Sequence, residues 1–223
     1  MPDIRPILRD AYSCSRCPEM FGFTNSPNGS YFKFPPLIGA NDRADLLFVG
    51  INPRRSASNS DLHQQLMSSK NVFKDLAANR VNGSPYIHHD SGEPHYHDHL
   101  EIIRQVYGKP RPFESCACVT ELFLCASENS AGLPHPESSC AAHFLPEVLE
   151  IIHPKVIVAV GSRVFAYFKT QPGIFTAKNE WAFLHHGRQI PVTQMPHPGN
   201  SKLDPSHRRS AIQVAARKIR AHL

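Results

Sequence analysis

The chain has 223 residues, a formal net charge of +5 and 41% apolar residues, and its pI is about 8.9. This length suits one domain with a full hydrophobic core, and the charge permits a polyanionic partner without requiring one. No run of 18 apolar residues occurs, which argues against a transmembrane helix. The first residues also lack the apolar stretch of a secretory signal, so we expect a cytoplasmic, intracellular protein.

The first half of the chain predicts a buried strand followed by two helices. Residues 44–51 (ADLLFVGI) are apolar without alternation, as in a parallel strand that is buried on both faces. Helical spacing of apolar residues predicts helices at 61–81 and 100–108, and Gly108 would end the second. The polar, turn-rich residues between them predict a histidine-rich surface insertion near 82–99.

In the second half, apolar runs alternate with segments of helical spacing. The strands are expected at 117–124, 155–161 and 190–195, and the helices at 135–152, 162–170 and 204–223. This alternation predicts an α/β fold, with a single domain over residues 1–223 and a central four-stranded, mostly parallel sheet flanked by helices. Such folds bind ligands at the carboxyl ends of their strands.

Two of the predicted strands end in unusual polar turns, GINPRR at 50–55 and MPHPGNSK at 195–202. Asn52 can hold a water or a substrate carbonyl, and His197, between two prolines, can donate a hydrogen bond to an oxygen that gains negative charge. Residues 198–202 offer backbone N–H groups and a lysine that suit a phosphate. An isolated Asn-Pro or His-Pro is usually only a turn. Their pairing on two strand ends favours cleavage at a nucleotide.

Three segments resemble motifs of the uracil-DNA glycosylase superfamily. LLFVGINPR (46–54) is similar to the first motif, in the form of the mismatch-specific branch, and MPHPGNSK to the second. IIHPKVIVAVGSRVFAYF (151–168) resembles the third-strand segment, and the order fits across roughly residues 10–220. The resemblance implies a three-layer sandwich and a monofunctional DNA glycosylase of base excision repair. Such an enzyme hydrolyses the N-glycosidic bond of uracil or a related deaminated base without cutting the strand.

The resemblance also implies roles for individual residues. Asn52 would position the attacking water, and His197 would stabilise the anionic oxygen of the departing base. The residues implied at the flipped base are Gly50, Ile51, Phe73 and Glu121. Those implied at DNA are Arg54, Arg55, Pro198, Gly199, Asn200, Ser201, Lys202 and Leu203, with Leu203 as a plug in the gap that the base leaves. The expected partner is DNA with uracil or another damaged base, bound by a monomer that associates with the nucleoid when acting.

Four cysteines form a candidate metal site. They are Cys14 and Cys17, in a C-x-x-C motif, and Cys125 and Cys140, 15 positions apart. By chemistry alone they suit Zn²⁺, a [4Fe–4S] cluster or buried thiols. The iron–sulfur branches of the superfamily have cysteines in similar order and spacing, so the resemblance implies a structural [4Fe–4S] cluster, with zinc as the alternative. Cys116 and Cys118 are expected in the core.

Glu121 departs from the pattern of the iron–sulfur branches, which read the base with an asparagine at this place. An ionised carboxylate accepts hydrogen bonds but cannot donate one to a carbonyl of uracil. Glu121 is therefore protonated by burial, or another group reads the base, or the base is not uracil, or Glu121 forms a structural ion pair. The role of Phe73 also stays open, because its position fits the apolar core face of its helix as well as a platform that stacks on the flipped base.

Two further functions stay open. One is a protein that binds damaged or abasic DNA with little turnover. The other is a hydrolase with a metal centre built from His88, His89, His95, His97 and His99. For these histidines we expect a solvated insertion near DNA. The basic helix at 204–223 fits DNA contact as well as a solvated face.

Overall fold

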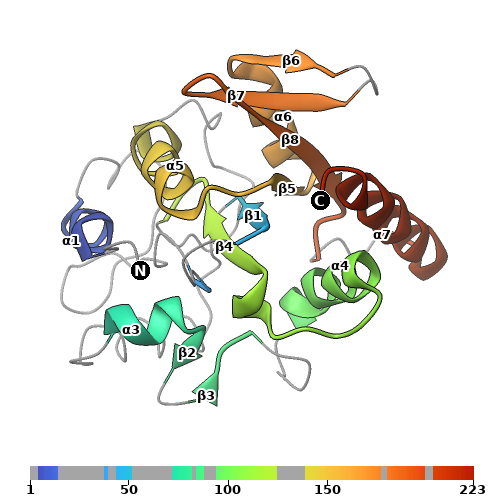
Figure 1. The fold of residues 1–223 in the computed structure, drawn as a ribbon, viewed down its shortest axis with the longest axis horizontal. Helices are drawn as coiled ribbons and strands as arrows, with labels where there is room; N and C mark the ends of the chain where they lie inside the picture. Colours follow the sequence, from blue (N-terminus) through green and yellow to red (C-terminus); the bar gives the residue numbers. More distant parts are fainter. Residues whose placement is uncertain are drawn as a thin grey trace.

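A sheet of six strands, in the order β4-β1-β5-β8-β7-β6, forms the centre of the molecule (Figure 1). The computed structural model describes residues 5–14, 38–39, 44–51, 72–81, 84–87, 94–124, 139–176, 180–198 and 203–223. The strands, in sheet order, are β4 (Ala117–Glu121), β1 (Leu46–Gly50), β5 (Val156–Val160), β8 (Arg188–Met195), β7 (Trp181–His185) and β6 (Gly173–Phe175). A separate hairpin pairs β2 (Arg80–Val81) with β3 (Ser84–Pro85).

The four predicted strands form the parallel part of this sheet. β1 pairs in parallel with β4 and β5, and β5 pairs in parallel with β8. All five residues of β1 and of β5 are buried, which confirms that their unbroken apolar runs are covered on both faces. The predicted α/β class is confirmed, but the count of four strands is wrong. β7 and β6 extend the sheet with antiparallel pairs. β6 is short and largely exposed, and β7 begins with an apolar run of four residues that is not among the predicted strands.

Helices surround this sheet. They are α1 (Arg5–Ser13), α3 (Val72–Ala77), α4 (His97–Tyr107), α5 (Ser139–Ile152), α6 (Ser162–Thr170) and α7 (Pro205–Arg220), with 3-10 turns η1 (Pro94–Tyr96) and η2 (Phe113–Ser115). α5 continues through Pro146. Asp204 caps the N-terminus of α7, and its side chain accepts a hydrogen bond from the N–H of Ser206. Figure 1 shows α4 and α7 side by side. No helix in the described ranges is long and apolar enough to cross a membrane.

Two predicted boundaries are wrong. The helix expected to end at residue 81 ends at Ala77, because Asn79 adopts a left-handed backbone with φ of 54° and its buried side chain pairs with the backbone of Ile87 at 2.8 and 3.0 Å. The insertion expected near 82–99 does not extend to residue 99. η1 and the start of α4 occupy residues 94–99, and His99 is 1% exposed.

The chain order of the parallel strands creates a switch point between β1 and β5. The chain passes from β1 to its neighbour β4, whereas from β5 it reaches β8 on the opposite side. The connections that leave two adjacent strands therefore diverge. In open α/β sheets, the crevice at the carboxyl ends of such strands is the usual ligand site.

Candidate active site

The carboxyl edge of β4 ends in a buried acid. Gly50 pairs with Glu121 in the sheet register. A Cβ added to Gly50 would lie 2.5 Å from Cδ and 2.6 Å from Oε1 of Glu121, so the carboxyl group occupies the place of a side chain at residue 50. Glu121 as a whole residue is partly exposed, but its Oε2 is buried and has no hydrogen-bond partner in the described structure. Burial raises the pKa of Glu121 to about 8, so the carboxyl is mainly protonated at neutral pH.

The carboxyl edge of β8 ends in His197. The N–H of Gly161, just past β5, donates to the carbonyl of Met195 at 2.9 Å. Gly161 has a φ of +92°, and a Cβ there would lie 3.2 Å from Cβ of His197. Glycine at position 161 thus serves both the backbone conformation and the close approach of the histidine. His197 is partly exposed.

Two histidines from the histidine-rich stretch join His197. The ring of His95, in η1, lies 5.9 Å from that of His197 and 5.8 Å from that of His99 (centroid distances). His99 is buried against Phe48, at 4.6 Å between centroids, and its Nδ1 has no hydrogen-bond partner in the described structure. Burial, with the nearby His95, holds the pKa of His99 well below its usual value. The expectation of a solvated insertion is therefore wrong for His99, whereas His95 is partly exposed.

An arginine on α7 fixes the loop that carries His197. Arg208 donates to both carboxylate oxygens of Asp98 on α4, at 2.7 to 3.2 Å. The same guanidinium donates to the backbone carbonyl of Pro198 at 2.6 Å. The side chains of Arg208 and Asp98 are largely buried, at 26% and 12% exposed, respectively. Arg208 thus joins α4, α7 and the residue after His197 through charge-assisted hydrogen bonds.

The part of the chain that contains β1, β4, β5 and β8 matches a known protein family. The model of the uracil DNA glycosylase superfamily matches residues 38–218. The chain belongs to this superfamily. Its members are DNA glycosylases, hydrolases that act on DNA and serve DNA repair, and this general class applies to the protein. No curated protein matches the chain.

Several residues that the resemblance singled out lie outside the described ranges. They are Asn52, Arg54, Arg55, Gly199, Asn200, Ser201, Lys202, Cys17 and Cys125, together with His88 and His89. Of Phe73, the backbone is in α3 and the side chain lies outside the described residues. Ile51, Pro198 and Leu203 are described. The Ile51 side chain belongs to the hydrophobic core, and Pro198 and Leu203 are partly exposed.

Two of the four candidate metal ligands are described. Cys14 follows α1 directly, Cys140 is in α5, and these two helices contact each other. Sγ of Cys140 accepts a hydrogen bond at 3.4 Å from the N–H of Leu124, the residue before Cys125. A backbone N–H that donates to sulfur is one of the features that tune iron–sulfur ligands. Cys116 and Cys118 are buried in the core, as predicted, and burial raises the pKa of both thiols, of Cys116 to about 11.

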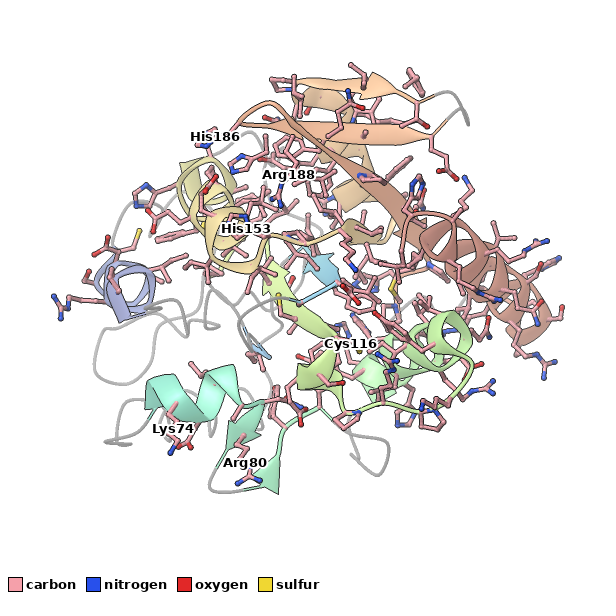
Figure 2. All side chains as sticks on the ribbon, viewed as in Figure 1. Lys74, Arg80, Cys116, His153, His186 and Arg188 are labelled. Carbon is pink, nitrogen blue, oxygen red and sulfur yellow. The ribbon has the colours of Figure 1, made fainter. Side chains whose placement is uncertain are left out.

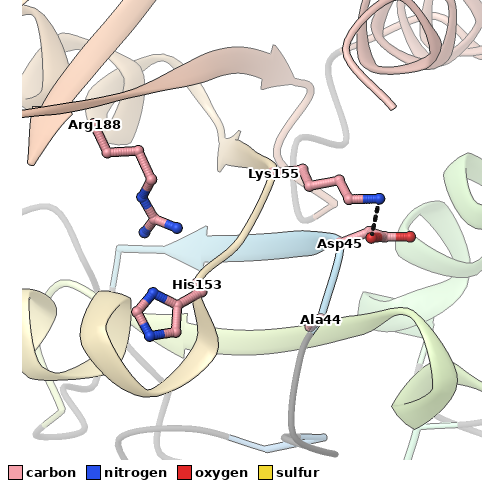
Figure 3. A pocket seen from close by; sticks show the side chains of 5 residues that line it. All are labelled: Ala44, Asp45, His153, Lys155 and Arg188. Carbon is pink, nitrogen blue, oxygen red and sulfur yellow. Dashed lines mark ion pairs between the residues drawn. The ribbon is translucent and has the colours of Figure 1, made fainter.

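An open pocket lies at the opposite, amino-end edge of the parallel strands (Figure 3). Its lining residues are Ala44, Asp45, His153, Lys155 and Arg188. Lys155 is paired with Asp45 at 2.9 Å. These residues precede or begin β1, β5 and β8, so this pocket is separate from the edge that carries Glu121 and His197.

Sequence reasoning missed the contacts of His95, His99, Asp98 and Arg208. One signal was available for the histidines, because positions 95 and 99 have the i, i+4 spacing that aligns side chains on one helical face. No comparable signal links Asp98 to Arg208, which are 110 positions apart.

Proposed function

We propose that the protein is a monofunctional DNA glycosylase that hydrolyses the N-glycosidic bond of uracil or a related deaminated base in DNA. The observation that supports this proposal is that two side chains at the carboxyl edge of the sheet each pack over a glycine of a neighbouring strand. Glu121 reaches from β4 onto Gly50 of β1, and His197 reaches from the end of β8 onto Gly161 at the tip of β5. Because β1 and β5 are neighbours, the two glycines lie at the carboxyl ends of adjacent strands, beside the switch point where a ligand is expected.

The protonated carboxyl of Glu121 suits the edge of a deaminated base. A neutral carboxylic acid carries one O–H donor and one carbonyl acceptor. Uracil, hypoxanthine and xanthine each present a ring carbonyl beside a ring N–H, which is the complementary pair. An ionised carboxylate would instead face the ring carbonyl with two acceptors. The unpartnered Oε2 of Glu121 supports this role, because a buried polar atom without a partner costs about 1–3 kcal/mol until a ligand satisfies it.

His197 and Asn52 would serve the two ends of the breaking bond. The base leaves as an anion while the sugar gains oxocarbenium character. His197 would donate a hydrogen bond to the anionic oxygen, and Asn52 would hold the attacking water on the sugar side. Asn52 follows the end of β1 and His197 follows β8, with only β5 between these strands. The spacing of strands thus separates the two strand ends by roughly 10 Å, which suits one nucleotide.

We also propose that Cys14, Cys17, Cys125 and Cys140 hold a [4Fe–4S] cluster, with zinc as the alternative. The cluster would have a structural role: it would tie the N-terminal α1 to α5 in the middle of the chain. The contact of α1 with α5 and the N–H donor at Cys140 support the assignment.

The test is a panel of oligonucleotides that contain uracil, hypoxanthine, xanthine or only normal bases, in single and double strands. Free base is measured directly, and abasic sites are measured by strand cleavage after alkali. We expect release of at least one deaminated base and an intact strand before alkali. His197→Ala should lower the rate about 10²–10³-fold, the typical effect of losing one donor to a developing anion. Asn52→Ala should abolish release but spare binding.

His153→Asn serves as the matched control, because His153 lines the pocket at the opposite edge and its left-handed backbone tolerates asparagine. Its rate should equal that of the wild type. Tight binding of damaged DNA with no base release from any oligonucleotide would contradict the proposal and favour a DNA-binding protein.

A further inference from the structure

Three metal-ligating side chains meet at the turn between β7 and β8, away from the carboxyl edge. They are Glu150 of α5, His185 at the end of β7 and His186 in the turn, and their ligand atoms all lie within 4.8 Å of one another. Nε2 of His185 is 2.8 Å, and Nδ1 of His186 is 3.0 Å, from Oε1 of Glu150. Figure 2 shows His186 beside the α5 helix.

The backbone holds these groups in place. His186 and Gly187 form the turn with φ of 46° and 77°, the left-handed pair that a two-residue hairpin of type I′ requires. His185 pairs with Arg188 across this turn and is only 7% exposed. The two imidazole rings stack in parallel, with 4.4 Å between centroids and 12° between planes. The site is therefore built on a rigid hairpin and a helix.

The donor set matches that of three-ligand zinc sites. Two imidazoles and one carboxylate are a known ligand combination for Zn²⁺, which then keeps a fourth position for water. Zinc bonds of about 2.0–2.1 Å at a tetrahedral angle hold two donors roughly 3.3 Å apart. The nitrogens are 2.8 and 3.0 Å from the carboxylate oxygen, so each nitrogen–oxygen pair needs a widening of a few tenths of an ångström. The two nitrogens lie within 4.8 Å of each other.

The exposed members of the set can make that adjustment. The side chains of Glu150 and His186 are 49% and 76% exposed, which gives an ion both access and room for rotation. The hydrogen bond from His185 holds the pKa of Glu150 below its usual value, so its carboxylate is ionised at neutral pH. With an ion bound, the ring nitrogen of each imidazole that faces Glu150 would bind the ion, and the other ring nitrogen would carry the hydrogen.

We propose that Glu150, His185 and His186 form a binding site for a divalent cation of the zinc type. The ion would join the end of α5 to the β7–β8 hairpin, at the amino-end edge of the parallel strands. It would stabilise this corner of the fold and take no part at Glu121 or His197. The proposal is therefore independent of the base-excision proposal.

The test compares zinc binding by the full-length wild type, His186→Asn and Glu150→Gln, after a mild chelator that leaves the iron content unchanged. Asparagine tolerates the left-handed turn, so His186→Asn removes the imidazole and keeps the backbone. Zinc is titrated by calorimetry and counted per chain. Any zinc bound by cysteines is common to all variants and cancels in the difference.

We expect the wild type to bind one zinc per chain more than either variant, or to bind that ion at least tenfold more tightly. Zinc should also raise the melting temperature of the wild type and of His153→Asn, the neighbouring control, but not of the two variants. Equal melting temperatures in chelator would show that the variants fold. Equal zinc number and affinity in the wild type and the two variants would overturn the proposal and leave a simple histidine–carboxylate ion pair.

Discussion

Glu121 is the residue whose chemistry depends most on its surroundings. The same glutamate on the surface would be ionised at neutral pH, whereas burial at the end of β4 raises its pKa to about 8. The space for its carboxyl exists only because residue 50 is glycine. The proposed base-reading carboxyl of Glu121 and Gly50 beneath it therefore form one unit, so a substitution of Gly50 also tests the role of Glu121.

Base release should fall as pH rises through about 8, because only the protonated form of Glu121 can donate to the carbonyl of the base. Glu121→Gln keeps a neutral donor and acceptor of similar shape. It should retain release at pH 7 and lose this alkaline decline. Single-turnover rates between pH 6 and 9.5 measure both effects. A wild type and a Glu121→Gln variant with the same alkaline limb would contradict the prediction.

Gly50→Ala should displace the carboxyl of Glu121, since the new methyl group would overlap it. We expect the free energy of unfolding to fall by about 1–3 kcal/mol, as for other overpacked cores, and base release to fall at least tenfold. Urea denaturation and single-turnover assays give the two values. Normal activity in Gly50→Ala would show that the position of Glu121 is unimportant for base reading.

At the scale of elements, α4 and α7 form a support for the loop after β8. Both helices contribute to it, through Asp98 and Arg208, and the contact ends on the carbonyl of Pro198. His99 is next to Asp98 in the first turn of α4, and His95 is in η1, which directly precedes that helix. The helix pair thus connects the buried His99 and the partly exposed His95 with the loop that presents His197.

Arg208→Met should loosen this loop, because it leaves a largely buried carboxylate and a carbonyl without their donor. We expect a loss of about 1–3 kcal/mol in the free energy of unfolding and about a tenfold lower rate of base release. Arg209→Met, at an exposed neighbour on α7, should change stability by about 0.5 kcal/mol or less. Equal destabilisation by the two substitutions would argue against a support role. Restoration of the rate by Arg208→Lys would show that a single donor is enough.

At the scale of the whole molecule, the proposed cluster would link the start of the chain to its middle. α1 meets the sheet core through Ile7 and Ala11, which are both buried, and it contacts α5. Cys14 and Cys140 lie on these two elements. A cluster there would add a covalent connection to a small apolar contact between segments that are more than 120 residues apart.

Cys14→Ala should remove the visible absorption near ~400 nm, which is typical of a [4Fe–4S] cluster, and most of the bound iron. The melting temperature should fall by several degrees, because α1 then depends on apolar contacts alone. Cys116→Ser is the control, since that thiol is buried far along the chain from the motif and donates weakly to the carbonyl of Phe113. It should keep its iron. A wild-type protein that contains zinc and no iron would show that the cysteines hold zinc instead of a cluster.

The sequence by itself determined most of the local elements and indicated the edge of the sheet where we propose the site. Apolar runs such as 46–50 and 156–160 can only be satisfied by burial on both faces, and this periodicity predicts parallel strands. The polar turn that contains His197 indicated the carboxyl edge, because open α/β sheets bind ligands at the carboxyl ends of their strands. Both predictions rest on residues that are close together in the chain, so they can be read directly from the sequence.

Only the tertiary structure decided which distant residues meet. The protonation of Glu121 depends on burial by segments elsewhere in the chain, and the contact of His95 with His197 depends on where α4 packs. The pairing of Asp98 with Arg208, and of Glu150 with the hairpin histidines, likewise arises from packing of separate elements. Desolvation and hydrogen bonding depend on which groups are close in space. The spacing of residues along the chain therefore does not predict them.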